Sequence, residues 1–325
     1  MRRPIVLLIA AAATASAARG EPLTVYAPDY FASEWGPGPA IEAAFEASCG
    51  CEMEYVTGDV LPRLRLEGER TDADVVIGLN TDTAEAARRT GLFAPHGVDI
   101  SDLSLPVAWT DDTFLPFNWS HTAFVYDETR LGDVPESFRA LLDAPAGLRI
   151  VVQDPRSSVS GLALALWIHR VFGEDATDAW ARLADKIVTV TAGWSESYGM
   201  FTEGEADMVL SYTTSPAYHI VAEGDDTKRA AIFPEGHYVM VETAAQLRGT
   251  DQPELAQAFM DFVLSPAFQE IIPEGNWSFP AKAAGPLPDG FGTLALPDVA
   301  LLYSAEEAEA LRETVVREFE AGLRR

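Results

Sequence analysis

The sequence predicts an α/β protein of two lobes, and two observations carry that prediction. Short strand-like runs alternate with longer helix-like runs along most of the chain, which is the order that builds a mostly parallel sheet covered by helices. Two long extended segments, 113–127 and 236–247, stand apart from this alternation. Each is long enough to cross between lobes, so the two ends of the chain would form one lobe and the middle the other. We expect residues 19–117 and 240–325 in lobe 1, residues 118–239 in lobe 2, and a ligand cleft between them.

The strands are expected where apolar residues run together without a helical period. Several of these runs are rich in Val and Ile, which is typical of strands buried on both faces of a sheet. The expected strands are 23–27, 74–79, 149–154, 186–191 and 206–212.

The helices are expected where apolar residues recur every three or four positions and end signals flank them. Pro39 suits the first turn of a helix over 39–50, and Gly50 suits its end. Ser157 and Ser158 are possible caps of a helix over 160–173. Further helices are expected over 253–265 and 304–325.

The N-terminus predicts export from the cytoplasm. Arg2 and Arg3 precede a short apolar run and an "ASA" sequence at 15–17, so we expect residues 1–18 to be a signal peptide. The run is too short for a permanent anchor, and we expect a soluble periplasmic protein. The net charge is -27, and removing Arg2 and Arg3 takes it to -29. Such an acidic chain argues against a nucleic-acid partner and permits a cationic ligand.

The two cysteines lie in "SCGCE" as Cys49 and Cys51. An oxidising periplasm favours a disulfide, although a bridge between residues so close constrains little chain. A zinc site is the alternative, but no His lies close in sequence to complete it.

Signatures of catalysis are missing from the sequence. It has no G-x-S-x-G, H-E-x-x-H, P-loop or dinucleotide-binding pattern, and its five His are scattered. His219 and His237 are interpreted as structural or surface residues. We therefore expect no catalytic residues, no metal and no cofactor.

Aromatic residues gather in the loops that follow expected strands. Ligands of open α/β sheets bind beyond the carboxyl ends of the strands, so these rings are candidates for one site. The stretch "LSYTTSPAYHI" adds hydroxyl groups without a Lys or Arg. A flat, delocalised cation suits this mixture, because aromatic faces attract it and hydroxyls bond to its polar edge. The candidate rings are Trp35, Trp194, Tyr212, Tyr218 and Trp277.

Many short motifs together resemble one family. They include "WGPGP", "SCGCE", "QDPRSS", "TAGWSESYG", "LSYTTSPAYHI" and "EGNW", and the likeness covers about residues 22–320. The sequence is similar in these motifs to the periplasmic thiamine-binding proteins of bacterial ABC importers. The resemblance implies a type II periplasmic binding protein fold, with two lobes that close on thiamine, a flat aminopyrimidine joined to a permanently charged thiazolium.

The family's ligand contacts fall on matching positions here. The resemblance implies contacts at Trp35, Ser158, Val159, Trp194, Tyr212, Thr213, Thr214, Ser215, Tyr218 and Trp277. Val159 stands where the family often has Thr. Segment 56–65 is shorter than the family's loop, and Asp59, its only carboxylate, is the candidate for an acidic contact.

The resemblance also implies the partners: thiamine, thiamine phosphates and the permease of an ABC transporter, with the binding protein itself a monomer. Two alternatives stay open. The first is a receptor for another organic cation, such as a polyamine or a related pyrimidine. The second is a periplasmic enzyme that degrades thiamine on the same fold, which would need an activated nucleophile.

Overall fold

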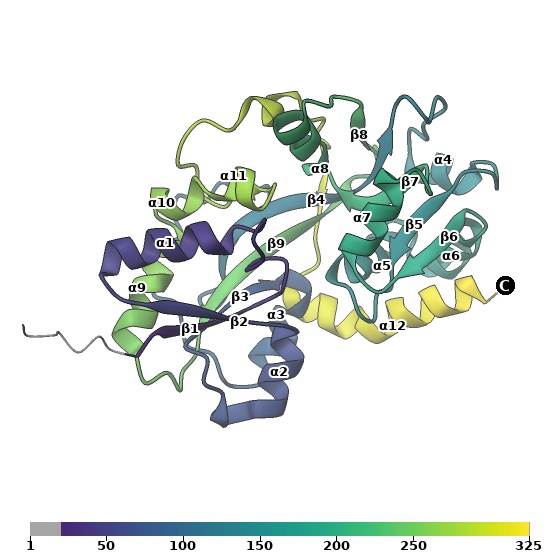
Figure 1. The fold of residues 1–325 in the computed structure, drawn as a ribbon. Coiled ribbons are helices and arrows are strands. Elements are labelled where there is room, and N and C mark those ends of the chain that lie inside the picture. The colour runs from purple at the N-terminus through teal and green to yellow at the C-terminus, as the bar shows by residue number, and fades with distance from the viewer. Residues whose placement is uncertain (1–20, 325) are drawn as a thin grey trace, which may run out of the picture.

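The computed structural model describes residues 21–324, and it is a two-lobed α/β fold. The expected signal peptide lies outside the described residues. In Figure 1, strands β1, β2 and β3 with helices α1 and α9 form one half, and β5, β6 and β7 with α5, α6 and α7 form the other. The long strands β4 and β9 run between the halves. No helix of residues 21–324 is both long and apolar enough to span a bilayer.

The first half is a sheet in the order β2-β1-β3-β9-β4. Strand β1 (Leu23–Ala27) is parallel to β2 (Met53–Thr57) and to β3 (Val75–Asn80). Helices α1 (Gly38–Cys49) and α9 (Pro253–Val263) pack together beside it through Phe45 and Phe259, whose rings are 5.0 Å apart. Because β1, β2 and β3 run the same way, their carboxyl ends meet at one edge of the sheet.

The second half continues the sheet in the order β4-β7-β5-β6. Its parallel strands are β5 (Ile150–Gln153), β6 (Ile187–Thr191) and β7 (Met208–Tyr212). Helix α5 (Val159–Phe172) is buried along most of its length, and α6 (Ala176–Ala184) packs against it.

Strands β4 (Leu115–Asp127) and β9 (His237–Gln246) join the halves. Strand β4 pairs with β9 as far as His121 and with β7 from Thr122 onward. The change of partner places the junction of the two halves at these two residues. Both expected extended segments are therefore confirmed as long strands, and their role as the crossings between two lobes stays a prediction.

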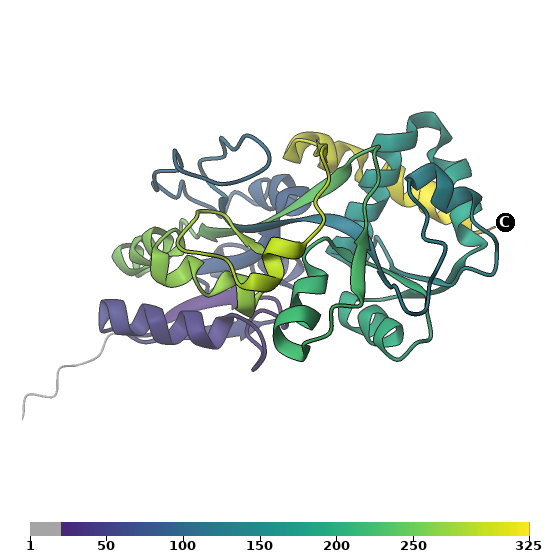
Figure 2. The ribbon, with the colours of Figure 1, turned by 90° about the horizontal axis from the view of Figure 1, so that it is seen from above.

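The C-terminal helix α12 (Ala305–Leu323) contacts both halves of the molecule. Its Phe319 packs edge-on against Trp180 of α6, with ring centres 5.0 Å apart, and its Arg312 donates to the Asp82 carbonyl at the start of α3 (Thr81–Arg88). Figure 2 shows it lying along the second half. The lobe boundaries remain a prediction, in which this helix was assigned to lobe 1 alone.

All five expected strands and all four expected helices are present, with ends shifted by a few residues at most. The sequence analysis did not assign the remaining elements. They are the strands β2, β8 (Lys228–Ala231), β10 (Phe279–Pro280) and β11 (Ala300–Leu301); the α-helices α2 (Val60–Glu67), α3, α4 (Phe138–Asp143), α6, α7 (Trp194–Thr202), α8 (Ser215–Tyr218), α10 (Pro266–Gln269) and α11 (Ile272–Gly275); the 3₁₀ turns at Gly68–Arg70, Gly173–Asp175 and Asp289–Thr293; and a π-helical turn at His219–Glu223.

Trp194 was expected in a loop and instead begins helix α7. Its inward residues Trp194, Ser197, Tyr198 and Phe201 follow a helical spacing. Ser and Gly interrupt the apolar residues of this short helix, so the period is hard to recognise in the sequence.

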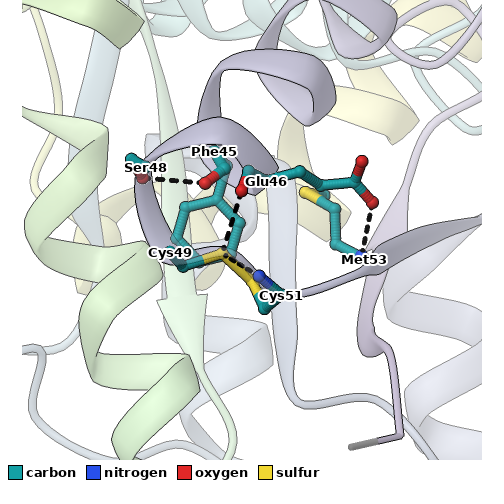
Figure 3. Close-up of a disulfide and its surroundings, with 6 residues drawn as sticks. All are labelled: Phe45, Glu46, Ser48, Cys49, Cys51 and Met53. Carbon is teal, nitrogen blue, oxygen red and sulfur yellow. Dashed lines mark hydrogen bonds between the residues drawn. A yellow bond between two sulfur atoms is a disulfide. The ribbon is translucent and has the colours of Figure 1, made fainter. Parts of the chain in front are cut away.

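The cysteines form the expected disulfide, with Cα atoms 5.2 Å apart (Figure 3). It lies at the end of α1, where Gly50 adopts the left-handed conformation that closes the helix. Cys51 leads into the amino end of β2, whereas a binding site is expected at the carboxyl end. Five strand residues, roughly 16 Å, separate the two edges.

Candidate functional site

The carboxyl ends of strands from both halves meet where the paired strands β4 and β9 pass from one half to the other. Strand β3 ends at Asn80, which pairs with Glu242 of β9, and Glu242 pairs on its other side with Asn118 of β4. Strand β7 ends at Tyr212, and the next amide, that of Thr213, donates to the His121 carbonyl at the junction. The fold thus brings the opening residues of "YTTS" next to the edge of the other half.

A network of hydroxyl groups holds the segment after β7. The Ser211 and Ser215 hydroxyls are 2.7 Å apart, and the Tyr212 amide donates to Ser215. The Trp194 indole N–H donates to Ser211 over 2.8 Å. Since its only donor is engaged, Trp194 can contact a ligand only through its ring.

The two threonines of this segment are buried. The Thr214 hydroxyl lies 3.0 Å from that of Ser120 on β4. The Thr213 hydroxyl and the indole nitrogen of Trp119 are both buried without a partner among the described residues. Buried polar groups are nearly always bonded, so these two are candidates for ligand contact.

Tyr212 is tied to the start of helix α5. Its hydroxyl lies 2.7 Å from that of Ser160, and burial raises the pKa of the Tyr212 phenol, which keeps it neutral. Ser158 caps the same helix by accepting from the Gly161 amide at 3.4 Å. The predicted cap is confirmed, and Val159 beside it is 41% exposed.

Tyr218 and Trp277 form a ring pair that joins the proposed lobes. Their ring centres are 5.3 Å apart and nearly perpendicular. Trp277 has φ 48°, the only positive value at a non-glycine among residues 21–324. A bulky residue adopts this conformation at a cost, and such strain gathers at functional sites.

Glu242 of β9 is a buried carboxylate that the sequence analysis did not identify, and it is bonded to the residue that precedes Trp277. It accepts from the Asn118 amide at 2.6 Å, from the Asn276 amide at 2.8 Å and from the Tyr30 hydroxyl. Burial raises the pKa of Glu242, and the three donors oppose that rise by stabilising the ionised form. All three donors are uncharged, so none of them neutralises the carboxylate.

Asp82 is a second buried carboxyl group near Tyr212, at the start of α3. It accepts from the Tyr238 hydroxyl at 2.7 Å, while its other oxygen has no partner among the described residues. Burial raises the pKa of Asp82 to about 6, against the opposing effects of Tyr238 and of the Arg312 charge. Asp82 and Glu242 both add negative potential at Tyr212.

The structure does not bring Trp35 and Asp59 into these networks. Trp35 is 65% exposed and makes no aromatic ring contact within residues 21–324. Asp59 is exposed and precedes α2 without capping it through its side chain. Asp59 does lie at the edge of the sheet where the carboxyl ends of the strands meet. The amide of Gly58, the residue before it, donates to the carbonyl of Ala27 at the end of β1.

One group in the described part of the chain has the composition of a metal site: His219, Glu223 and Asp225 bring one ligand atom each within 4.8 Å of one another. Each already has a protein partner. His219 bonds to Tyr198 and Glu223, and Asp225 pairs with the Lys228 ammonium at 2.8 Å. These contacts account for the cluster without an ion.

Residues 28–270 match the family described as bacterial extracellular solute-binding protein. The chain is 48% identical to the thiamine-binding periplasmic protein of Escherichia coli K12, over 93% of this chain and 94% of that one. It is 47% identical to the protein of the same name from Salmonella typhimurium, over 99% and 98%.

A solved structure described as a periplasmic thiamin binding protein is also similar. It superimposes with a TM-score of 0.90 at 47% identity, covering 94% of this chain and 99% of that one. Fold, sequence and solved structure agree, and the chain belongs to the family of bacterial extracellular solute-binding proteins.

Proposed function

We propose that this protein captures thiamine between its lobes and delivers it to an ABC importer. The observation that carries the proposal is the combination of aromatic rings from both proposed lobes with a buried, uncompensated carboxylate at one edge of the sheet. Thiamine combines a flat pyrimidine with a thiazolium whose positive charge has no N–H to donate. Aromatic faces and a nearby anion are the groups that bind such a cation. The relatives named thiamine-binding support the same ligand.

Different residues would supply different kinds of contact to thiamine. Trp194, Tyr218 and Trp277 offer ring faces and edges, and Glu242 supplies the opposite charge. The hydroxyl groups of Tyr212, Thr213, Thr214 and Ser215 are suited to the polar edge of the pyrimidine. Trp35 and Asp59 would contact the ligand only if the loops that carry them move onto it.

Thiamine phosphates are proposed as further ligands. Helix α5 begins at Val159, and the amides at the start of a helix attract anions. Ser158 is half-buried at this end and offers a hydroxyl. A phosphate would lie there, with Val159 contributing its backbone amide and its methyl groups.

Contacts from both lobes favour a closed state when the ligand is bound, because only that state makes all of them at once. The hinge would lie where β4 exchanges β9 for β7. Closure would let a permease distinguish the loaded protein from the empty one. We further propose that the protein acts as a monomer in the periplasm.

The proposal includes no catalysis. A thiamine-degrading enzyme needs a nucleophile, and both thiols of this chain are joined in a disulfide at the opposite edge of the first sheet. A receptor for a polyamine would need carboxylates spaced along an extended chain of ammonium groups. Glu242 and Asp82 instead gather near one tyrosine, which favours a compact cation.

Mass spectrometry of the molecule that copurifies with the native protein tests the proposal. We expect thiamine or one of its phosphates in about equimolar amount, released intact after incubation. A copurifying polyamine would instead identify the protein as a receptor for another organic cation. Release of free pyrimidine on incubation with thiamine would establish the enzyme instead.

A further inference from the structure

Three of the rings assigned to the site are connected through two residues that the sequence analysis did not assign to it. Trp194 stacks on Tyr198 at 4.7 Å, with 22° between the ring planes. Tyr198 in turn lies nearly parallel to His219, at 5.9 Å and 20°. The rings of His219 and Tyr218 are nearly perpendicular with centres 5.1 Å apart, and Tyr218 is likewise nearly perpendicular to Trp277. We call these five residues, Trp194, Tyr198, His219, Tyr218 and Trp277, the ring chain.

Hydrogen bonds fix the orientation of His219 at the centre of the ring chain. Its Nδ1 lies 2.6 Å from a Glu223 carboxylate oxygen, and its Nε2 lies 2.9 Å from the Tyr198 hydroxyl. An ionised carboxylate can only accept, so Nδ1 donates to Glu223. In the neutral ring, Nε2 is then left to accept the Tyr198 proton.

Tyr198 also connects to the hydroxyl network that holds Trp194. Burial raises the pKa of the Tyr198 phenol and the nearby Ser215 hydroxyl opposes that rise. Ser215 in turn bonds to Ser211, the acceptor of the Trp194 indole N–H. Tyr198 therefore supports Trp194 twice, by covering one ring face and through the serines. One face of Trp194 is occupied by Tyr198, so a planar ligand would have to stack on the other face.

We propose that His219, anchored by Glu223, is a positioning residue that orients Trp194 through Tyr198, and Tyr218 directly, for stacking on the ligand. The proposal rests on the proposed function. An apolar residue would fill the same buried space without two hydrogen bonds, so packing alone does not account for a histidine here. His219 also begins the π-helical turn, an uncommon conformation that is frequent at functional sites.

The test uses variants that change hydrogen bonds separately from packing. Tyr198→Phe keeps the stacked ring and removes the hydroxyl. His219→Gln places an acceptor near the Nε2 position, whereas His219→Leu removes both bonds. Tyr126→Phe is the matched control, a half-buried tyrosine of β4 in the same proposed lobe.

Affinity for thiamine is measured by calorimetry, folding stability by urea unfolding, and the Trp fluorescence change at saturating thiamine is recorded for each variant. We expect Tyr198→Phe to weaken binding by about three- to tenfold, the effect of one lost hydrogen bond, and His219→Leu, which loses two, to weaken it at least as much. Their fluorescence change at saturation should be smaller, because Trp194 no longer lies flat on the ligand. His219→Gln should bind more tightly than His219→Leu, and Tyr126→Phe like the wild type.

The positioning role is overturned if Tyr198→Phe, which should fold in any case, binds within twofold of the wild type with the same fluorescence change. A loss of stability with unchanged affinity and fluorescence would likewise reduce His219 to a core residue. Failure of the wild-type protein itself to bind thiamine would overturn the proposed function and, with it, this inference.

Discussion

Two regions of the candidate site differ in how their aromatic residues are supported. Trp194, Tyr218 and Trp277 belong to the ring chain and lie on or beside short helices. Trp35 lies in the loop before α1, 65% exposed and without a ring partner in the described residues. Both kinds of position follow strands, and both match family motifs. Only the residues of the first region are held in place by neighbouring rings in the structure.

The difference has an energetic consequence. A side chain already held by neighbours loses little freedom on binding, whereas a free one loses about 0.5–1.5 kcal/mol. We therefore expect affinity to depend mainly on the ring chain and on Glu242, and less on Trp35 and Asp59.

The largest effect is expected from Trp194→Ala. The substitution removes a ring face held by Tyr198 and Ser211, and a desolvated cation–π contact contributes about 2 kcal/mol. Calorimetry should show thiamine binding weakened by at least tenfold. Trp180→Phe is the control, since Trp180 is buried against Phe319 of α12. It should lower stability and leave affinity unchanged, and equal losses in the two variants would contradict the comparison.

Glu242→Gln should have the next largest effect, several-fold to about tenfold. Glutamine keeps the shape and one acceptor but removes the charge that opposes the thiazolium. The informative comparison uses an analogue in which an uncharged thiophene ring replaces the thiazolium. The variant should lose affinity for thiamine and not for this analogue, and an equal loss for both would assign Glu242 a structural role.

Trp35→Ala and Asp59→Asn should weaken binding less than Trp194→Ala, each by about threefold or less. Both residues are exposed and would have to be ordered by the ligand. Titrations under the same conditions rank the three variants. A loss at Trp35 as large as that at Trp194 would mean that the loop closes fully over the ligand.

The smallest effect is expected for the double variant Cys49→Ser and Cys51→Ser. A bridge between residues two apart removes little entropy from the unfolded chain. It also lies at the edge of the sheet away from Glu242. Affinity should be unchanged within error, and a marked loss in a folded variant would revive the enzyme alternative.

Much of the fold could be predicted from the sequence, because buried strands and amphipathic helices leave local patterns. The runs of Val and Ile in β3 and β5 and the period of α9 depend only on their neighbours in sequence. Helix α7 was missed since it is short and its period includes Ser and Gly. The packing of α12 on both halves depends on contacts between segments far apart in the chain, which no local pattern records.

The candidate site was predicted unevenly for the same reason. Trp194 and the residues of "YTTS" were predicted first as rings and hydroxyls that follow expected strands and then from family motifs, and the structure connects them by hydrogen bonds. Glu242 lies within a strand expected to cross between lobes. Its surroundings depend on hydrogen bonds from Asn118 and Asn276, which are distant in sequence. A carboxylate directly after the apolar run "YVMV" of a long extended segment was the available signal.

The most direct test of the account is a calorimetric titration of thiamine into protein that has been unfolded, freed of bound ligand and refolded. The account predicts one thiamine per chain, with tight binding to the wild type and binding at least tenfold weaker to Trp194→Ala. No heat change and no Trp fluorescence response at millimolar thiamine would contradict it.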